Sequence, residues 1–353
     1  MAATPFDDPL LSALLGDDGI AASFTSEAEV GEMNRFEAAL AEAEAAEGVI
    51  PTDAAQAIAS ACAVFRPDFA ALRAGAARDG VIGPEYVRQL RAHVGSRHGD
   101  HVHLGATSQD LADTSLVLRL GKVVTEFDAR LSAVTNRLDD LHGAFGRNTL
   151  MGRTRMQDAQ PIEVADRIRT WRGPLERHRT RLAEIRPRLL VLQFGGAVGT
   201  REKLGAKGDA VARRLAQTLG LGYAEPWHSQ RDRFAELAAW LALVSGSLGK
   251  IGADVALMAQ NAVAEVHLTG GGGSSAMPHK SNPVAAEVLV ALARHNATLS
   301  ANMQHALVHE NERSGAAWTL EWLTLTQMVI GTAAALRTAL VLLGRIESIG
   351  KPV

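Results

Sequence analysis

Apolar residues between positions 232 and 266 recur at steps of three and four, the spacing that places side chains on one face of an α-helix. The series is Leu237, Leu241, Val244, Leu248, Ile251, Val255 and Met258. Such a seam is typical of a helix that packs lengthwise in a bundle. The sequence lacks a sustained alternation of apolar and polar residues, the pattern of a half-buried strand. The pattern therefore predicts an all-α fold.

Similar periodic segments predict a set of long and short helices. Long helices are expected over 109–144, 161–193, 232–266, 283–311 and 317–346, and shorter ones over 26–47, 52–65 and 83–97. Gly173-Pro174 should kink the second long helix, because proline cannot donate a hydrogen bond there. We expect two domains, an N-terminal helical domain over 1–105 and a central long-helix bundle over 106–353.

The length of these helices predicts an oligomer. A helix of about 35 residues is about 50 Å long, at about 1.5 Å per residue, which is more than a compact monomer of this size would bury. In an up-and-down bundle, segments 103–114 and 270–283 would lie at opposite ends of one chain. We therefore predict that neighbouring subunits bring these ends together into composite sites.

Charge and cysteine content narrow the class of protein. The chain has 36 basic and 39 acidic residues, so it has no overall field for nucleic acid or a membrane. Cys62 is the single cysteine, which fits a reducing compartment, and the first basic residue is Arg35, so a secretory signal is not indicated. The apolar runs 237–249 and 322–336 are shorter than the roughly 20 residues of a membrane span. We expect a cytoplasmic protein.

Polar clusters recur at the expected helix ends. They are H-L-G-A-T-S-Q-D-L-A-D-T (103–114), G-R-T-R-M-Q-D-A-Q-P (152–161), Q-F-G-G-A-V-G-T (193–200), P-W-H-S-Q-R-D-R (226–233) and G-G-G-G-S-S-A-M-P-H-K-S-N-P (270–283). Ser108 is a plausible N-cap, Pro161 a plausible first helical residue, and Asn282 an N-cap before Pro283. Because helix N-termini carry free N–H groups and partial positive charge, we expect carboxylate ligands there.

These motifs carry a family resemblance. The pattern G-S-S-x-M-P-x-K-x-N-P resembles the signature of the fumarase/aspartase superfamily. The motifs G-A-T-S-Q-D, Q-F-G-G-A-V-G-T, P-W-H-S-Q-R-D-R and E-N-E-R-S-G-A-A-W-T-L-E-W look like its branch of bacterial carboxymuconate cycloisomerases. The resemblance implies an all-helical homotetramer with a shared central core, sites built from three subunits, and neither metal nor organic cofactor. It also implies that a small C-terminal domain of the family is largely absent here.

The resemblance assigns candidate site residues by motif position. Ser274 matches the catalytic serine that transfers a proton at carbon. The candidate substrate-binding residues are His103, Thr107, Ser108, Gln109, Arg155, Gln157, His228, Arg231, Lys280, Asn282 and Arg313. Arg155 is a departure, because the lyases carry histidine at that position.

This departure favours one chemistry within the superfamily. The shared step removes a proton beside a carboxylate, and the resulting dianion must be held by N–H groups and a cation. Amine leaving groups need a general acid, whereas a carboxylate with a pKa of about 4 departs unaided. Arg155 in place of histidine therefore favours lactonisation of 3-carboxy-cis,cis-muconate in protocatechuate catabolism. The alternatives are a 3-sulfomuconate cycloisomerase, an argininosuccinate- or adenylosuccinate-type lyase, and a non-enzymatic structural relative.

Two other interpretations of the polar residues are less favoured. The glycine-rich segment resembles a flexible linker in composition, but its signature extends through Met277, Lys280 and Asn282. His98, His101 and His103 lie near one another in the sequence, but their spacing matches no common zinc pattern. We therefore expect a catalytic segment and no metal site.

Overall fold

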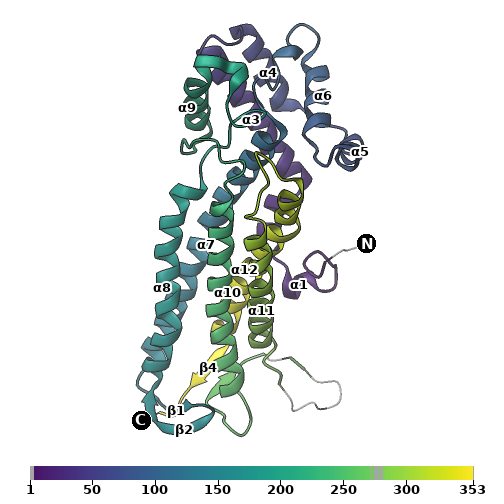
Figure 1. Ribbon diagram of the computed structural model, residues 1–353. Helices are drawn as coiled ribbons and strands as arrows, with labels where there is room; N and C mark the ends of the chain where they lie inside the picture. The colour runs from purple at the N-terminus through teal and green to yellow at the C-terminus, as the bar shows by residue number, and fades with distance from the viewer. Residues whose placement is uncertain (1–3, 271, 274–276, 278–280, 353) are drawn as a thin grey trace.

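The computed structural model is mostly helical and describes residues 4–270, 272–273, 277 and 281–352 (Figure 1). Five long helices form a bundle, and most of the shorter helices gather at one of its ends. The long helices are α7 (Ser108–Phe145), α8 (Val164–Leu189), α10 (Asp232–Met258), α11 (Val284–His305) and α12 (Gly315–Gly344). They run alternately up and down, which confirms the predicted all-α bundle.

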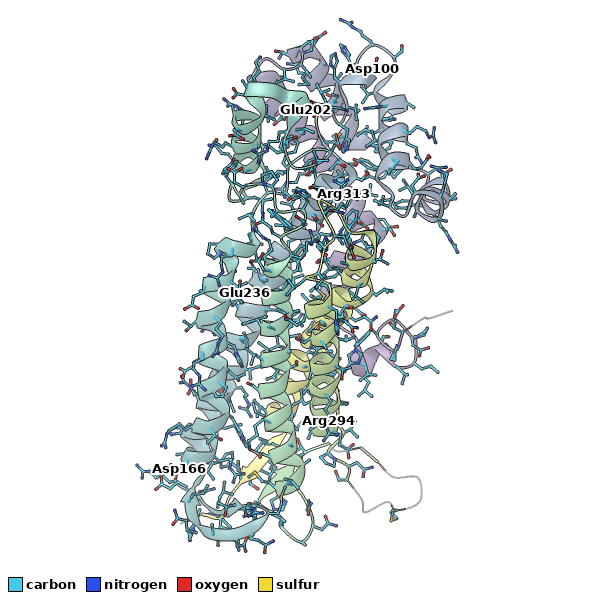
Figure 2. All side chains as sticks on the ribbon, viewed as in Figure 1. Asp100, Asp166, Glu202, Glu236, Arg294 and Arg313 are labelled. Atoms are coloured by element: carbon cyan, nitrogen blue, oxygen red, sulfur yellow. The ribbon has the colours of Figure 1, made fainter. Side chains whose placement is uncertain are left out.

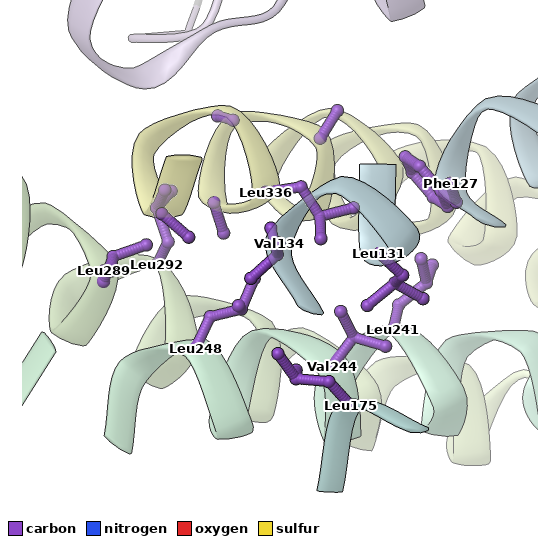
Figure 3. Close-up of a cluster of buried hydrophobic side chains, with 14 of the residues drawn as sticks. Phe127, Leu131, Val134, Leu175, Leu241, Val244, Leu248, Leu289, Leu292 and Leu336 are labelled. Atoms are coloured by element: carbon purple, nitrogen blue, oxygen red, sulfur yellow. The ribbon is translucent and has the colours of Figure 1, made fainter. Parts of the chain in front are cut away.

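The predicted seam of α10 lies in the core of this bundle. Each of its seven apolar residues, from Leu237 to Met258, is at most 2% exposed. Figure 3 shows the side chains from all five long helices that meet there, including Phe127, Leu131, Val134, Leu175, Leu241, Val244, Leu248, Leu289, Leu292 and Leu336. Burying side chains of this kind contributes about 1.5–3 kcal/mol each, so the sequence periodicity corresponds directly to the main source of stability.

The short helices enclose a second core. They comprise α3 (Ser26–Ala46), α4 (Thr52–Val64), α5 (Phe69–Asp79), α6 (Gly83–Val94) and α9 (Gly208–Leu219), with 3₁₀ turns at Gly99–His101 and Glu202–Lys207. By contrast, α1 (Ser12–Leu15), α2 (Asp18–Ala21) and the 3₁₀ turn at Ala22–Phe24 pack against the long-helix bundle. Phe36, Tyr86, Phe194 and Leu215 belong to the second core, so it also draws on residues beyond position 105. The domain division at residue 105 remains a prediction.

Two small sheets interrupt the helical fold at the other end of the bundle (Figure 1). β1 (Thr149–Thr154) pairs with β2 (Gln157–Glu163), and β3 (Val266–Leu268) pairs with β4 (Ile346–Ile349), both antiparallel. The helix predicted over 161–193 therefore begins at Val164, three residues after its predicted start. Pro161 lies opposite Met151 in the first sheet, not at a first helical position. A two-stranded sheet tolerates proline because each strand has an unpaired edge.

Several helix ends differ from their predicted positions. The N-cap of α7 is Thr107 rather than Ser108, because the Thr107 side chain and Asp110 form a capping box. The N-cap of α11 is Pro283, one residue after the expected Asn282. α8 continues through Gly173 and Pro174 as one helix.

The helices α10 and α12 are long and apolar enough to cross a membrane by length and composition. The charge-free runs 237–249 and 322–336 are thus parts of longer apolar helices. In each helix, half or more of the most apolar window is buried inside the protein. Their apolar character is accounted for by the shared core of the bundle.

Candidate active site

The start of α7 is fixed by Asp110, which lies under the loop that carries Thr107. The Thr107 N–H donates to Asp110 Oδ2 at 3.0 Å, and the N–H groups of Gly195 and Gly196 donate to the same carboxylate at 2.8 Å. Gln193 Nε2 donates to it at 2.9 Å. Burial raises the pKa of Asp110 to about 6 even though these donors favour its charged form. Segments 103–114 and 193–200 are therefore held together by one carboxylate.

Ser108 and Gln109 follow this loop in different environments. The Ser108 side chain packs against Gly83 so closely that a Cβ at Gly83 would lie 2.5 Å from its Oγ. Gln109 is fully buried, and its Nε2 donates to the His228 carbonyl oxygen at 2.8 Å. Its Oε1 accepts from Arg313 Nε at 2.8 Å. Gln109 thus links three of the predicted segments at one end of the bundle.

Arg231 lies beside Gln109 and is bound by carboxylates of its own chain. It makes four hydrogen bonds, two to Asp113 of α7 at 2.5 and 3.1 Å and two to Glu321 of α12 at 2.7 and 2.5 Å. All three side chains are at most 2% exposed. Burial opposes the charge of Arg231, but the two carboxylates outweigh it and raise its pKa above the ordinary value. Because a guanidinium has five N–H donors, four are used inside the chain.

Two buried histidines flank this ion cluster. His228 and His309 have both ring nitrogens buried and without a hydrogen-bond partner among the described residues. His309 Nε2 lies 3.9 Å from Glu321 Oε1. Burial lowers the pKa of each imidazole, and the nearby cations Arg313 and Arg231 lower it further. Both rings are therefore kept neutral at pH 7.

His309 and Glu321 were not among the candidates from the sequence. His309 falls within the helix predicted over 283–311, but α11 ends at His305, and His309 in the chain beyond it lies beside Glu321. Glu321 lies 90 residues from Arg231 in the chain. The E-N-E-R-S-G-A-A-W-T-L-E-W motif contains Glu321, which was the one available signal.

His103 lies in the loop before α7 and has a buried carboxylate partner. Its Nδ1 is 2.5 Å from Oε1 of Glu37, a residue of α3 with a fully buried side chain. The backbone of His103 has a φ of 61°, in the left-handed region. Glu37 was missed because it lies 66 residues earlier and in no recognised motif.

Arg155 and Gln157 lie at the opposite end of the molecule, on the hairpin between β1 and β2 (Figure 1). Arg155 and Met156 form its two-residue turn, with φ values of 50° and 66°, and both are exposed. A turn with two positive φ angles favours glycine or asparagine, and a larger residue there costs about 1 kcal/mol or more. The chain thus presents a cation on a strained tip.

Glu265 anchors this hairpin to the segment that leads toward residues 270–283. Its Oε2 accepts from Arg153 Nη1 at 2.7 Å, and its Oε1 accepts from the Met151 N–H at 3.2 Å. Further on, Gly272 and Asn282 exchange two backbone hydrogen bonds of 2.9 Å just before α11. Ser274 and Lys280 lie outside the described residues.

The predicted site residues therefore fall into two groups at the two ends of one chain. We call them the capping end (His103, Thr107, Ser108, Gln109, His228, Arg231 and Arg313) and the hairpin end (Arg155, Gln157 and Asn282). Figure 2 places Arg313 beside the short helices and Asp166, which follows β2, at the far end. Among the described residues, no group of three or more histidine, cysteine, aspartate or glutamate side chains is arranged to hold a metal ion.

A cavity of about 340 Å³ adjoins the capping end. Asp113 and Glu321 line one side of it, so the carboxylates that bind Arg231 also face this space. Arg119 and Trp322 contribute to its other walls. None of the described residues that were predicted to bind substrate lines this cavity.

Comparison with known proteins places the chain in a family. Residues 18–295 match a family described as lyase, which is more than half of the chain. This chain belongs to the fumarase/aspartase superfamily. The match confirms the resemblance drawn from the G-S-S-x-M-P-x-K-x-N-P signature.

Individual members of the superfamily are similar along nearly the whole chain. A 3-carboxy-cis,cis-muconate cycloisomerase of Pseudomonas aeruginosa is 42% identical over 333 residues, which cover 92% of this chain and 72% of the relative. A relative of the same name from Bradyrhizobium diazoefficiens is 42% identical over 335 residues, covering 93% and 74%. The crystal structure of 3-carboxy-cis,cis-muconate lactonizing enzyme from Pseudomonas putida matches with a TM-score of 0.91 at 39% identity, covering 97% of this chain and 77% of that one.

Proposed function

We propose that this chain is a 3-carboxy-cis,cis-muconate cycloisomerase, which closes its substrate to a carboxymuconolactone in protocatechuate catabolism. The main support is the 42% identity to cycloisomerases over more than nine tenths of the chain. Arg155 adds independent support, because an exposed cation suits a substrate with three carboxylates. We further propose that the enzyme needs no metal or organic cofactor and acts in the cytoplasm.

The reaction requires one proton and groups that stabilise negative charge on the substrate. A carboxylate oxygen of the substrate adds to a conjugated carbon–carbon double bond, and the displaced electron pair moves to the carbon beside a second carboxylate. That carbon then takes a proton, so a trianion and one proton give a dianionic lactone. We assign this proton transfer to Ser274. N–H groups and cations must stabilise the dianionic carboxylate before the proton arrives.

The two ends of the chain supply different parts of this environment. At the hairpin end, Arg155, Gln157 and Asn282 are proposed to bind carboxylates, and Lys280 of segment 270–283 is proposed to have the same role. At the capping end, the residues proposed to bind carboxylates are His103, Thr107, Ser108, Gln109, His228 and Arg313. They surround the start of α7, where free backbone N–H groups favour an anionic ligand. Arg231 has one N–H left for substrate, so its main proposed role is to hold α7, α10 and α12 in register.

One chain cannot bring its two ends together. The 38 residues of α7 span about 57 Å at about 1.5 Å per residue, and they separate the capping end from the hairpin. We therefore propose a homotetramer in which the hairpin end and segment 270–283 of neighbouring subunits meet the capping end. The proposal agrees with the exposure of Arg155 and Gln157 in the single chain.

An ultraviolet absorbance assay tests the proposed substrate. The purified protein is given 3-carboxymuconate, 3-sulfomuconate and argininosuccinate separately, and kcat/KM is compared. We expect loss of the conjugated diene to be fastest with 3-carboxymuconate. Faster loss of 3-sulfomuconate would change the substrate, and fumarate release exceeding muconate turnover would indicate a lyase. No turnover of any of the three would favour a non-enzymatic relative.

A further inference from the structure

Glu37 and His103 form a carboxylate–imidazole pair directly behind the loop that starts α7. The Glu37 side chain is fully buried and that of His103 is 10% exposed, with 2.5 Å between Oε1 and Nδ1. The pair therefore joins the interior of the short-helix region to the edge of the proposed site. His103 precedes Thr107 by four residues, so its ring stays within about 14 Å of that helix start.

Among the described residues, His103 is the hydrogen-bond partner of the Glu37 carboxylate. The charge of Glu37 acts on Glu44 of α3, Cys62 of α4 and Tyr86 of α6, which are all buried. Its Oε2 is buried without a hydrogen-bond partner among the described residues. A buried carboxylate in such surroundings is costly unless a partner donates a hydrogen bond to it.

The backbone of His103 is held in an unfavourable conformation that suits this pairing. A φ of 61° costs a residue with a Cβ about 1 kcal/mol or more, and such strain persists where the surrounding structure enforces it. Arg91 of α6 donates to the Val102 carbonyl at 3.1 Å and so fixes the residue that precedes His103. With Nδ1 directed at Glu37, Nε2 is the nitrogen left to meet a ligand.

We propose that Glu37 is a positioning residue that directs Nε2 of His103 toward a substrate carboxylate and lets that nitrogen take up a proton when the substrate binds. A neutral ring with its hydrogen on Nδ1 presents a bare Nε2, which repels a carboxylate. When a proton from solvent bonds to Nε2, the ring becomes a cation that donates to the substrate and is balanced by Glu37. No substrate bond breaks in this step, and the proton returns to solvent when product leaves. The inference rests on the proposed carboxylate site at the capping end.

The first experiment measures proton uptake on binding. Titration calorimetry at pH 8 in two buffers of different ionisation enthalpy uses tricarballylate, a saturated tricarboxylate that cannot form a lactone. At this pH an ordinary imidazole is mostly neutral. We expect uptake of about one proton by the unmodified protein, little uptake by Glu37→Gln, and an affinity roughly tenfold to a hundredfold weaker in that variant.

Glu44→Gln is the matched control. Glu44 lies two turns along the same face of α3 and is equally buried, but it makes no hydrogen bond to His103. We expect this variant to bind with the proton uptake of the unmodified protein. Equal losses in both variants would reduce Glu37 to a structural role, and unchanged uptake in Glu37→Gln would overturn the proposal.

A second measurement does not depend on any ligand. Nitrogen NMR of histidine-labelled protein reports the tautomer of His103, with its signal assigned through a His103→Gln variant. We expect the Nδ1–H tautomer in the unmodified protein and in Glu44→Gln, and its loss in Glu37→Gln. A ring with its hydrogen on Nε2 in the unmodified protein would refute the pairing. If NMR shows the Nδ1–H tautomer but 3-carboxymuconate is not turned over, the proposed substrate is wrong, whereas the Glu37–His103 pairing is still supported.

Discussion

The capping end and the hairpin end differ in how their charged and polar side chains are paired. At the capping end, Arg231 is buried with two carboxylates, and Gln109 uses both ends of its amide inside the chain. At the hairpin end, Arg155 is exposed on a turn with positive φ. The charged groups of the capping end are paired within the chain, whereas Arg155 at the hairpin end is left exposed for a ligand or a neighbouring subunit.

This difference indicates how a composite site divides its work. A buried ion cluster fixes geometry but has few donors left for a ligand, whereas an exposed cation is available but weak in water. If neighbouring subunits bring the two ends together, the rigid end excludes water and the displayed cation gains strength there. The predictions below test this division, starting with the largest effect.

Mixed tetramers should regain activity that neither variant has alone. Arg313→Met alters the capping end and Ser274→Ala the hairpin-side segment, so each homotetramer lacks an intact site. Subunits that are unfolded and reassembled together should recover roughly one quarter of full activity, because a site drawn from two subunits is intact in about one case in four. The measurement is kcat on 3-carboxymuconate.

A second mixture controls this experiment. Ser274→Ala and Lys280→Met alter the same segment, so any subunit that supplies this segment is defective. We expect no recovery from that mixture. Recovery there, or none in the first mixture, would show that the two ends do not combine as proposed.

Replacing Arg231 by leucine should cause the largest loss of stability. Asp113 and Glu321 would remain buried without a cation, and breaking such a pair costs about 3–5 kcal/mol. Arg188→Leu is the control, since Arg188 pairs with Glu236 while both side chains are more than a third exposed, and we expect a loss below about 1 kcal/mol. Urea unfolding at one protein concentration measures both. Similar losses would mean that the capping end is not the more rigid one.

Arg155→Gly should separate activity from stability. Glycine accepts the positive φ, so unfolding should change by about 1 kcal/mol or less. Loss of the cation should lower kcat/KM roughly tenfold to a hundredfold, as for a charged hydrogen bond. Met156→Gly relieves the same kind of strain at the neighbouring position and should leave kcat/KM nearly unchanged. A matching loss in Met156→Gly would assign the effect to hairpin shape rather than charge.

The sequence predicted the parts of the fold that are determined by residues close to one another along the chain. The seam from Leu237 to Met258 repeats within one helix, and every member is buried. Segment 149–163 was misjudged because its two short strands carry little apolar alternation, and Pro161 suggested a helix start instead. The hairpin also hydrogen-bonds to Glu265, about 110 residues away along the chain, and local patterns do not contain this contact.

The site was predicted only as far as its motifs extend. Gln109, His228 and Arg313 lie in recognised motifs and meet at the capping end. The sequence did not indicate which carboxylates pair with the predicted cations, because Asp113 and Arg231 are 118 residues apart, and Glu37 and His103 are 66 apart. Such pairs become visible only once the chain is folded, so the sequence indicated the ligands better than the groups that orient them.

The smallest expected effect concerns a buried acid next to the capping end. Burial, helped by the charge of Glu37, raises the pKa of Glu44 from 4.5 to about 9. The folded protein then holds a proton between these two values that the unfolded chain has released, so stability falls as pH rises through this window. Between pH 7 and 9 we expect the free energy of unfolding, measured with urea, to fall by about 2 kcal/mol. Glu44→Gln carries no titratable group and should flatten this part of the profile; an unchanged slope would mean that other groups cause it.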